Sequence, residues 1–470
     1  MDYKDYDFGL VGLGVMGRNF ILNVADNNFK AFGYDLDGEK VEALKTEGGD
    51  LSKVSASTDI NTFVQALSSP RKIMLLVPAG KIVDQAIESL LPYLDKDDII
   101  IDGGNSFFTD TDRREAYLKE KGIHFFGSGV SGGAEGARKG PSIMPGGDKE
   151  AYQHVKPIFE AVSAKYKGEP CVAYLGPKSA GNYVKMVHNG IEYAMMQLTS
   201  EIYDLLKKSS ELSNEELHQV YSKWNEGRLQ SFLVEITAEI FTQKDDLTDG
   251  DLVDMILDKA KQKGTGKWTS QNAMDLGIPV PTIDMAVSMR EISALKDERI
   301  VADNLYNRPE IPSISKEELI EKAEQALYFA FIIAYAQGLH QLSYASKEYG
   351  YELDMATIAR IWRAGCIIRA GLLADIAEAY TADKEVPNLL LSPSFVPKVQ
   401  ETLPAVRDMV AFAAKSGIPV PGLSSALSYF DAYTSSKLPL NLIQAQRDHF
   451  GSHTYERIDR EGIFHTEWGS

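Results

Sequence analysis

The chain has 470 residues, of which 44% are hydrophobic and 25% are charged, and its formal net charge is −18. This length exceeds what one hydrophobic core usually serves, so we expect two or three domains. The acidic balance argues against nucleic acid and against a membrane surface as main partners, because both need a basic footprint. A local cluster of Lys and Arg still allows a small anionic substrate.

The cysteine content and the apolar runs indicate a cytoplasmic protein. Cys171 and Cys366 provide neither a disulfide framework nor a metal-binding spacing, which fits a reducing compartment. The polar first residues do not resemble a signal peptide. The longest apolar run, at about residues 326–336, is too short to cross a bilayer.

Residues 8–11 predict a short strand that leads directly into a glycine motif, Gly-Leu-Gly-Val-Met-Gly. A helical pattern follows, and a second apolar run at residues 29–34 ends in an acid. Strand, glycine turn, helix, strand and acid together predict a dinucleotide-binding unit, against the alternative of a glycine-rich turn without a ligand. The residues that this unit assigns to the cofactor are Gly12, Leu13, Gly14, Val15, Met16, Gly17 and Asp35.

Alternation of strands and helices predicts a Rossmann-like domain over residues 1–178. Strands are expected at residues 72–77, 98–102, 123–127 and near 171–175, and helices at 82–93, 109–121 and 149–163. The loops after such strands line the ligand crevice, here residues 78–80, 103–106 and 127–133. Four further cofactor contacts are expected at these strand ends, namely Val77, Pro78, Ala79 and Asn105.

Residues 179–434 predict an all-helical domain that repeats itself. Ile278-Pro279-Val280-Pro281 recurs 140 residues later at Ile418, each time after a glycine, and Trp224 is echoed by Trp362. We interpret this as a duplicated helical unit of about 140 residues. The tail, residues 435–470, holds a possible helix at 441–450 and then a polar end, which is either frayed or docked on a partner subunit.

A polar stripe on the expected helix from Ala180 to about Lys208 is the main candidate for catalysis. Lys185, His188, Asn189 and Glu192 share one helical face within an otherwise apolar segment. The alternative is a solvated helix face. In the second repeat, the corresponding stretch at about residues 324–331 lacks both the Lys and the Glu. That difference favours function for the first copy.

A basic segment offers an anion site for such a helix. Lys263 precedes Gly264-Thr265-Gly266-Lys267-Trp268, and Arg290 and Arg447 add charge farther along. Lys, Arg, backbone amides and a Thr hydroxyl suit a phosphate group. For each residue alone the alternative is an ordinary surface charge, and spacing does not show that these segments meet.

The motifs GLGVMGRN, IDGGNS, GSGVSGGAEGARKGPSIMPGG, KMVHNGIEY, KGTGKWT and QRDHFGSHTYE occur in this order. With them the chain resembles the decarboxylating 6-phosphogluconate dehydrogenases from end to end. The resemblance implies a homodimer whose tail inserts into the other subunit. It implies oxidation of 6-phosphogluconate at C3 by NADP, loss of carbon dioxide and formation of ribulose 5-phosphate, without a metal.

The resemblance also implies roles for individual residues. Lys185 would be the base in hydride transfer and then the acid that polarises the keto oxygen, and Glu192 would protonate C1 of the enediol. The residues that would hold the sugar acid are Asn105, Ser131, Gly132, Gly133, His188 and Asn189. Those that would hold its phosphate are Tyr193, Lys263, Thr265 and Arg290, with Arg447 and His453 from the partner subunit.

The chain departs from the family pattern at two places. The family usually has Asn-Arg-Ser or Asn-Arg-Thr after the second strand, and its Arg binds the 2′-phosphate of NADP. Here Asp35-Leu36-Asp37 stands instead, which predicts a preference for NAD or use of both cofactors. Ala134 replaces a common Glu, while Glu135 remains, so we expect only a local effect on the nicotinamide pocket.

Two other functions fit parts of the pattern. A smaller β-hydroxyacid dehydrogenase would share the glycine motif and the lysine, but not the duplicated helices or the Arg447 tail. A dinucleotide-binding sensor without turnover would not need Lys185 at all.

Overall fold

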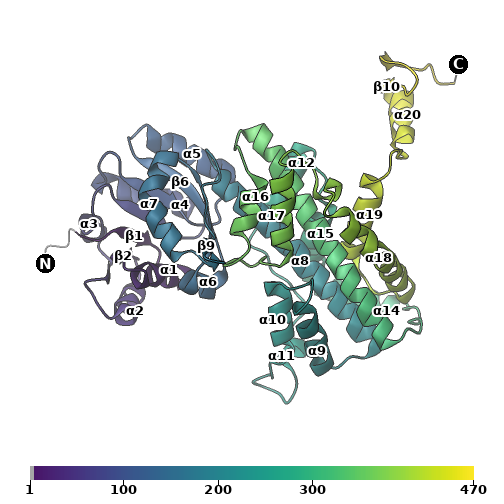
Figure 1. Ribbon diagram of the computed structural model, residues 1–470, viewed down its shortest axis with the longest axis horizontal. Coiled ribbons are helices and arrows are strands. Elements are labelled where there is room, and N and C mark those ends of the chain that lie inside the picture. The colour runs from purple at the N-terminus through teal and green to yellow at the C-terminus, as the bar shows by residue number, and fades with distance from the viewer. Residues whose placement is uncertain (1–4, 470) are drawn as a thin grey trace.

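The computed structural model describes residues 5–469, so the first four residues, part of the segment compared above with signal peptides, lie outside it. Figure 1 shows an N-terminal α/β part, a helical part beside it, and a tail that projects beyond the helical part. The expected fold class, a Rossmann-like domain plus a large helical domain, is confirmed. Among the described residues, no helix combines the length and the apolar character that a membrane span needs.

The N-terminal sheet has seven strands in the order β3-β2-β1-β4-β5-β6-β7. Its strands are β1 (Phe8–Val11), β2 (Ala31–Tyr34), β3 (Val54–Ser57), β4 (Lys72–Leu75), β5 (Ile99–Asp102), β6 (His124–Ser131) and β7 (Ser142–Gly147). The strands up to β6 pair in parallel, and β7 pairs antiparallel with β6. The strand order reverses its direction between β1 and β4, and dinucleotides bind in such sheets at the crevice outside the strand ends at this point.

Alternate residues of the strands enter two separate cores, one on each face of the sheet. Ile99 and Ile101 of β5 join a cluster with Phe20 and Phe159, whereas Ile100 joins the cluster on the other face. The helices of this domain are α1 (Val15–Asp26), α2 (Gly38–Gly48), α3 (Ile60–Gln65), α4 (Lys81–Leu90), α5 (Phe108–Lys119), α6 (Gly133–Lys139) and α7 (Lys149–Val162). A 3-10 turn, η1 (Leu91–Tyr93), and a hairpin of β8 (Lys165–Tyr166) and β9 (Glu169–Pro170) complete it.

Two expectations about this sheet are wrong. Residues 127–131 belong to β6 and not to a loop, because Gly127 and Gly129 lie against α8 (Ala180–Ser210), where a Cβ at Gly129 would come within 2.4 Å of Lys185 Cβ. Residues 171–175 lie along β7 but form only one bridge, between Val172 and Ile143. A strand does not develop there because Pro145 of β7 has no N–H for the next ladder bond.

Two long helices, α8 and α15 (Lys316–Tyr349), run side by side through the centre of the helical domain (Figure 1). Their close approach requires Gly338, because a Cβ there would lie 2.5 Å from Ile191. The other helices are α9 (Asn214–Asn225), α10 (Phe232–Ile240), α11 (Leu252–Met255), α12 (Thr265–Leu276), α13 (Pro281–Ala294), α14 (Lys296–Leu305), α16 (Met355–Ile361), α17 (Leu372–Ala382), η2 (Leu389–Leu391), α18 (Val396–Ser416) and α19 (Pro421–Tyr433).

The two halves of the helical domain match in local geometry. Gly277 ends α12 with φ 69° and ψ 27°, and Gly417 ends α18 with φ 64° and ψ 23°. Each glycine precedes a helix with Pro at its first position, α13 or α19. Where the halves meet, Ser231 and Ala370, 139 residues apart, form an antiparallel bridge. This spacing, close to the repeat length, places equivalent positions opposite each other across a local two-fold axis.

The tail is a folded unit and not a frayed end, contrary to one of the two alternatives considered above. It consists of α20 (Leu440–Gly451) and a hairpin of β10 (Tyr455–Glu456) and β11 (Ile463–Phe464). The buried carboxylate of Asp448 accepts hydrogen bonds from Thr454 N at 2.9 Å, Thr466 N at 3.0 Å, and Trp468 Nε1 and His465 Nδ1 at 2.8 Å each. These bonds lower the pKa of Asp448 and raise that of His465. Four donors on one carboxylate hold helix and hairpin together.

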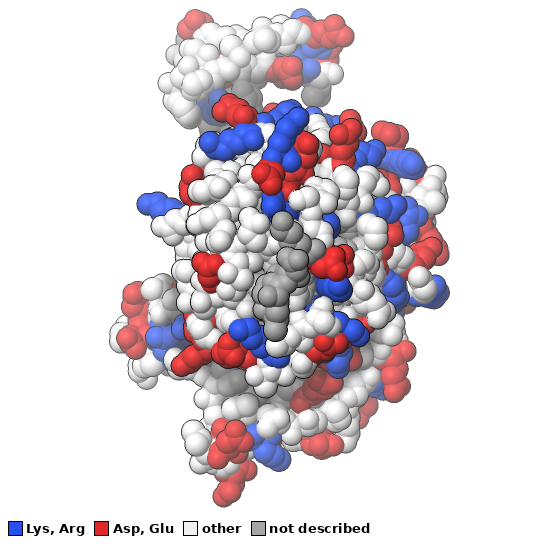
Figure 2. Space-filling view, turned by 90° about the vertical axis from the view of Figure 1, so that its left-hand side faces the viewer, with Lys and Arg blue, Asp and Glu red and all other residues white. Residues whose placement is uncertain are grey.

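Figure 2 views the molecule from the side of the N-terminal domain. Lys and Arg side chains are scattered there among Asp and Glu side chains, with uncharged surface between them. The acidic residues on this face therefore do not form one continuous negative patch.

Candidate active site

The glycine turn after β1 has the shape that a dinucleotide pyrophosphate needs. Gly12 has φ 98°, and a Cβ on it would lie 2.5 Å from Leu76 O. A Cβ on Gly17 would lie 1.9 Å from Gly12 O, so this glycine lets α1 pack against the turn. Gly14, the N-cap of α1, has open space where its side chain would be. An anion can therefore approach the positive end of the helix.

Asp35 lies beside this turn at the end of β2. Its carboxylate accepts a hydrogen bond from Leu13 N at 2.7 Å and one from Asp37 N at 3.0 Å. Lys40 lies 3.6 Å from a carboxylate oxygen of Asp35 and also 3.6 Å from one of Asp37, while Leu36 between them is 84% exposed. The acid is thus fixed where a cofactor ribose passes the second strand.

The other expected cofactor residues lie on loops at the same edge of the sheet. Val77 is half-buried after β4, with Pro78 and Ala79 exposed beside it. Asn105 is exposed in the loop after β5. Asn182 of α8 donates a hydrogen bond to Gly104 O at 3.3 Å, so this loop is tied to the helix that carries the polar stripe.

The polar stripe of α8 faces β6 and not solvent. Lys185 and His188 are buried, with 5% and 0% of their surface exposed. Lys185 Nζ lies 3.4 Å from His188 Nδ1, and His188 Nε2 lies 3.2 Å from Ser131 Oγ of β6. Glu192, two turns after Lys185, lies 3.9 Å from the histidine ring. This geometry excludes the solvated-face interpretation.

Burial shifts all three ionisable groups towards their neutral forms. It lowers the pKa of Lys185 from 10.5, against the attraction of Glu192. It raises the pKa of Glu192 from 4.5, against Lys185 and Arg290. The pKa of His188 falls well below 6.5 through burial and the adjacent Lys185. An amine that can accept a proton therefore lies near a carboxyl that can donate one.

The basic segment lies next to this stripe, and most of it belongs to a helix. Thr265 and Gly266 open α12, with Gly264 as N-cap at φ 104°. Asn189 Nδ2 donates to Thr265 Oγ1 at 3.0 Å, so a helix N-terminus, suited to anions, joins the site. Lys263 before it is exposed.

Tyr193 and Arg290 extend the site on the same side. The guanidinium carbon of Arg290 lies 3.5 Å from the centre of the Tyr193 ring, and one of its nitrogens donates to Lys261 O at 3.0 Å. A Cβ on Gly266 would lie 2.3 Å from the Tyr193 ring, so that glycine admits the ring against α12. Arginine, tyrosine and helix N-terminus thus form one cationic end of the cleft.

Comparison with known proteins agrees with this geometry. The family model for the NAD binding domain of 6-phosphogluconate dehydrogenase matches residues 7–176, and the model for its C-terminal domain matches residues 181–468. The chain belongs to the 6-phosphogluconate dehydrogenase family. Its relatives include the NADP(+)-dependent, decarboxylating enzyme of Bacillus subtilis, 54% identical, and the decarboxylating enzyme of Escherichia coli, 52% identical, each match covering 98% of both chains.

A solved structure of the family has the same fold. The 6-phosphogluconate dehydrogenase of Plasmodium falciparum is 46% identical with a TM-score of 0.95, and the match covers 98% of this chain and 100% of that one. That enzyme is described in its apo form, with its cofactor NADP+ and with its substrate 6-phosphogluconate.

The sequence analysis did not predict one group of residues that contact this site. Trp362 lies edge-on to His188, with ring centres 5.5 Å apart, and Ile367 N donates to Ser131 Oγ at 3.4 Å. Gly132 has φ 127°, and a Cβ there would lie 2.6 Å from Gly365 O, whereas Gly133 is exposed. The second helical repeat thus closes the cleft; the echo of Trp224 in Trp362 was its only sequence signal.

Two expected residues are not brought into this cleft by their own chain. Arg447 and His453 lie in the tail, which projects away from α8 (Figure 1). Arg447 donates to Gln444 Oε1 at 3.2 Å, and His453 is exposed. At the departure from the family pattern, Ala134 lies in the first turn of α6, and Glu135 pairs with Lys139 at 2.7 Å on an exposed face.

Proposed function

We propose that this protein oxidises and decarboxylates 6-phosphogluconate to ribulose 5-phosphate and carbon dioxide, with reduction of NAD or NADP, in the pentose phosphate pathway. The observation that carries the proposal is the burial of the Lys185 amine, with a lowered pKa, on a helix face that meets the end of β6. Beside it lie a neutral histidine and a carboxyl with a raised pKa. A surface lysine would have neither the burial nor these neighbours.

In this proposal the two ionisable groups of α8 act in sequence. Neutral Lys185 would remove the proton of the C3 hydroxyl, and a nicotinamide held at the glycine turn would supply the acceptor for the hydride of C3. Lys185, now protonated, then donates a hydrogen bond to the 3-keto oxygen, which stabilises the negative charge that develops as carbon dioxide leaves C2. The same oxygen takes the Lys185 proton, which gives the enediol. Glu192 then donates its proton to the carbon that carbon dioxide left, C1 of the enediol, while Lys185 takes back the enol proton, and the ketose results.

The remaining polar groups hold the substrate between the two domains. The groups proposed for the carboxylate and hydroxyls are Asn105, Ser131, Gly132, Gly133, His188 and Asn189. The groups proposed for the phosphate are Lys263, Thr265, Tyr193 and Arg290. The N-terminus of α12 and the Arg290 guanidinium support the second assignment, since both suit a phosphate dianion.

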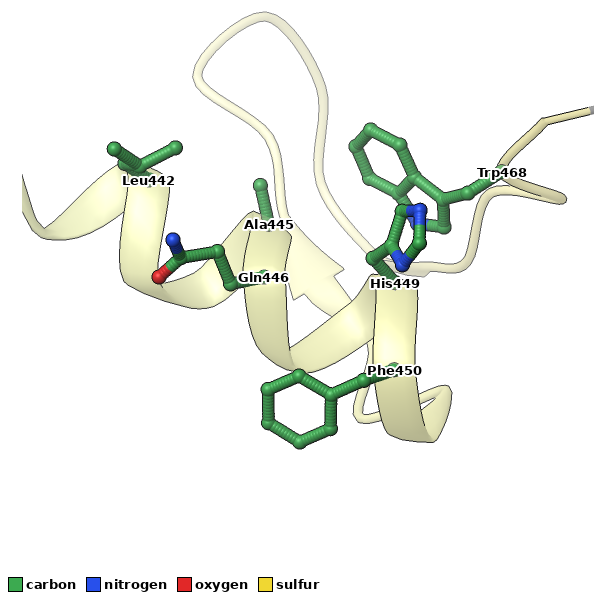
Figure 3. Close-up of a pocket in the computed structure, with 6 residues that line it drawn as sticks. All are labelled: Leu442, Ala445, Gln446, His449, Phe450 and Trp468. Carbon is green, nitrogen blue, oxygen red and sulfur yellow. The ribbon is translucent and has the colours of Figure 1, made fainter.

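The phosphate site is completed, in this proposal, by the tail of a second copy of the chain. The tail carries a groove of about 300 Å³. Figure 3 shows the side chains that line it, Leu442, Ala445, Gln446, His449, Phe450 and Trp468. Leu442 is 62% exposed and Phe450 is 73% exposed, on an arm that projects from the molecule. A preformed arm with an uncovered apolar face fits a homodimer that exchanges tails.

A mixing experiment tests this exchange. Lys185→Met and Arg447→Ala are each expected to be nearly inactive when pure. After the two are mixed and their subunits reassorted, each mixed dimer holds one intact site if the tail acts across the interface. Activity should then return to about a quarter of wild type. Failure to regain activity, with mixed dimers demonstrated by mass, would contradict tail exchange.

For the cofactor, we propose a preference for NAD or use of both NAD and NADP. Asp35 and Asp37 place two carboxylates where a 2′-phosphate would lie, balanced only in part by Lys40, and Leu36 provides no cation. Initial rates with each cofactor test this directly. Leu36→Arg should raise kcat/KM with NADP, and a strong wild-type preference for NADP would contradict the proposal.

The proposed activity is tested by supplying 6-phosphogluconate with both cofactors and measuring carbon dioxide together with NADH or NADPH. A smaller β-hydroxyacid dehydrogenase would release no carbon dioxide and would prefer short unphosphorylated acids. Equimolar formation of ribulose 5-phosphate and reduced cofactor is the expected result.

A further inference from the structure

Arg114, on α5, is a buried cation of the N-terminal domain that has several hydrogen-bond partners. Its side chain is 1% exposed. Its Nε donates to Asp84 at 2.8 Å and one terminal nitrogen donates to Gly80 O at 3.0 Å. The other terminal nitrogen reaches Ser106 Oγ at 3.2 Å and Asp102 at 3.4 Å. One planar group thus binds four acceptors in two segments of the chain, residues 80–84 and residues 102–106.

Each of these two segments includes a loop at the cofactor edge of the sheet. Gly80 ends the loop after β4, and Asp102 and Ser106 flank the loop after β5 that contains Asn105. These strands are direct neighbours in the sheet. The loops after such strands are where a dinucleotide crosses the sheet edge. Arg114 lies behind both loops and ties them together.

The same helix is also tied to the helix that carries Lys185. Thr111 Oγ1 donates to Asn182 Oδ1 at 3.2 Å, and Asp112 accepts a hydrogen bond from Ser179 N at 2.9 Å. Asn182 in turn donates to Gly104 O. Helix α5 therefore contacts the cofactor loops on one face and the start of α8 on another, and so connects the two.

We infer that Arg114 is a positioning residue that sets the distance between the cofactor loops and the catalytic helix without touching either reactant. This inference rests on the function proposed above. Hydride transfer requires donor and acceptor carbons in near contact, and a displacement of about 1 Å costs about 100-fold in rate. Lysine cannot replace the guanidinium, because a single ammonium cannot reach acceptors in several directions within one plane.

The natural control is the adjacent arginine. Arg113 also binds Asp84, at 3.0 Å, but its side chain is 55% exposed and it reaches neither loop. Arg113→Lys and Arg114→Lys therefore change the same residue type on the same helix. Ser106→Ala is a milder variant, because it removes one acceptor of Arg114 and keeps the guanidinium opposite the buried Asp102. Loss of the guanidinium would leave the Asp102 charge unpaired, which could prevent folding.

The experiment compares kcat, the KM for each substrate and the primary deuterium effect of C3-labelled 6-phosphogluconate, all per folded molecule. Arg114→Lys should lower kcat/KM for the cofactor by about 100-fold and increase the isotope effect, while the KM for the sugar acid should stay within about twofold of wild type. Ser106→Ala should show the same pattern at about two- to tenfold. Arg113→Lys should stay within about twofold throughout.

Equal effects of Arg114→Lys and Arg113→Lys, or an Arg114→Lys effect on both KM values without a change in isotope effect, would overturn the inference. If Arg114→Lys does not fold, Ser106→Ala decides by the same pattern: an unchanged cofactor KM and isotope effect would overturn it. Absence of turnover in the wild type with 6-phosphogluconate would instead contradict the proposed function, so the two failures are distinguishable.

Discussion

In the duplication that we propose for the helical domain, helices α8 and α15 hold equivalent places, yet only α8 carries the polar stripe. Lys185, His188, Asn189 and Glu192 of α8 correspond, 140 residues later, to Gln325, Tyr328, Phe329 and Ile332 of α15. Both faces are largely buried. The environment differs: the α8 face meets β6 and α12, whereas Phe329 packs on Phe430 of α19, with ring centres 5.6 Å apart.

This comparison distinguishes the free-energy cost of burying polar groups on α8 from the catalytic role of those groups. The scaffold tolerates an apolar face at the equivalent position, so packing alone does not require an amine, an imidazole and a carboxyl there. Burial of these groups costs free energy and pushes each towards its neutral form. The polar copy is the one that faces the cofactor domain. Substitutions at paired positions in α8 and α15 can therefore test whether chemistry, and not stability, requires the polar face.

The largest difference is expected at the first pair. Lys185→Met should lower turnover by about 10³-fold, because the proton acceptor for the C3 hydroxyl is lost. Gln325→Met, at the equivalent place in α15, should leave turnover within about twofold of wild type. Steady-state assays on both variants, with thermal unfolding as a check on folding, make the comparison. A Lys185→Met enzyme with a tenth of wild-type activity would refute the role of this lysine.

The next difference concerns pH. Lys185 must be neutral to act as a base, so the rate rises as pH passes its lowered pKa, and Glu192 must be protonated, so the rate falls as pH passes its raised pKa. Glu192→Gln should lower kcat by about 100-fold and abolish the fall in rate that deprotonation of Glu192 causes. The profile of kcat/KM from pH 5 to 10 measures this. An unchanged rate would remove Glu192 from the mechanism.

A third test changes the packing of α8 on α12. A Cβ on Gly190 would lie 2.6 Å from Thr269 Cγ2, so Gly190→Ala should displace α12 and with it Thr265. We expect a higher KM for the sugar acid and a loss of about 1–3 kcal/mol in unfolding free energy. The equivalent residue in α15 is already Ala330, and Ala330→Gly should cost about 1 kcal/mol without a change in KM. Denaturant unfolding and KM measurements decide; equal KM values would refute the displacement.

The smallest effect is expected at Glu201, whose counterpart in α15 is Gln341. Glu201 accepts hydrogen bonds from Gly422 N at 2.7 Å and Leu423 N at 2.9 Å, at the start of α19, and burial raises its pKa to about 7. Between pH 4.5 and 7 the folded state keeps a proton that the unfolded state releases, so the unfolding free energy falls as pH rises.

Glu201→Gln, which makes α8 resemble α15 at this place, should remove that dependence, worth about 1–3 kcal/mol between pH 4.5 and 8. Urea unfolding of wild type and variant at several pH values measures the difference. Parallel curves for the two proteins would show that Glu201 does not titrate in this range.

The sequence predicted the elements whose signal is local. The glycine turn, the acid after β2 and the periodicity of α8 follow from short stretches, and the fold class follows from their order. The strand β7 was not predicted because Ser-Ile-Met-Pro-Gly-Gly has the composition of a loop. Its glycines are accounted for by tertiary contacts: a Cβ on Gly146 would lie 2.3 Å from Gly181 N of α8.

Site residues from distant segments could not be predicted in the same way. Trp362 and Ile367 reach Ser131 and His188 only because the second repeat folds back on the first. Arg114 has no motif, and its role depends on acceptors brought together from two segments, residues 80–84 and 102–106. The tail's order likewise depends on Asp448, whose partners lie up to 20 residues away.

The bridge between Ser231 and Ala370 bears on how such a chain arose. A protein with a single copy of the helical unit would present this edge unpaired, and two such proteins could join it across a true rotation axis. A chain ending near residue 312 should therefore self-associate, which gel filtration would reveal. On this view the helical domain is an ancestral dimer fused into one polypeptide. One former subunit kept the catalytic residues, and the other now contributes mainly packing against it.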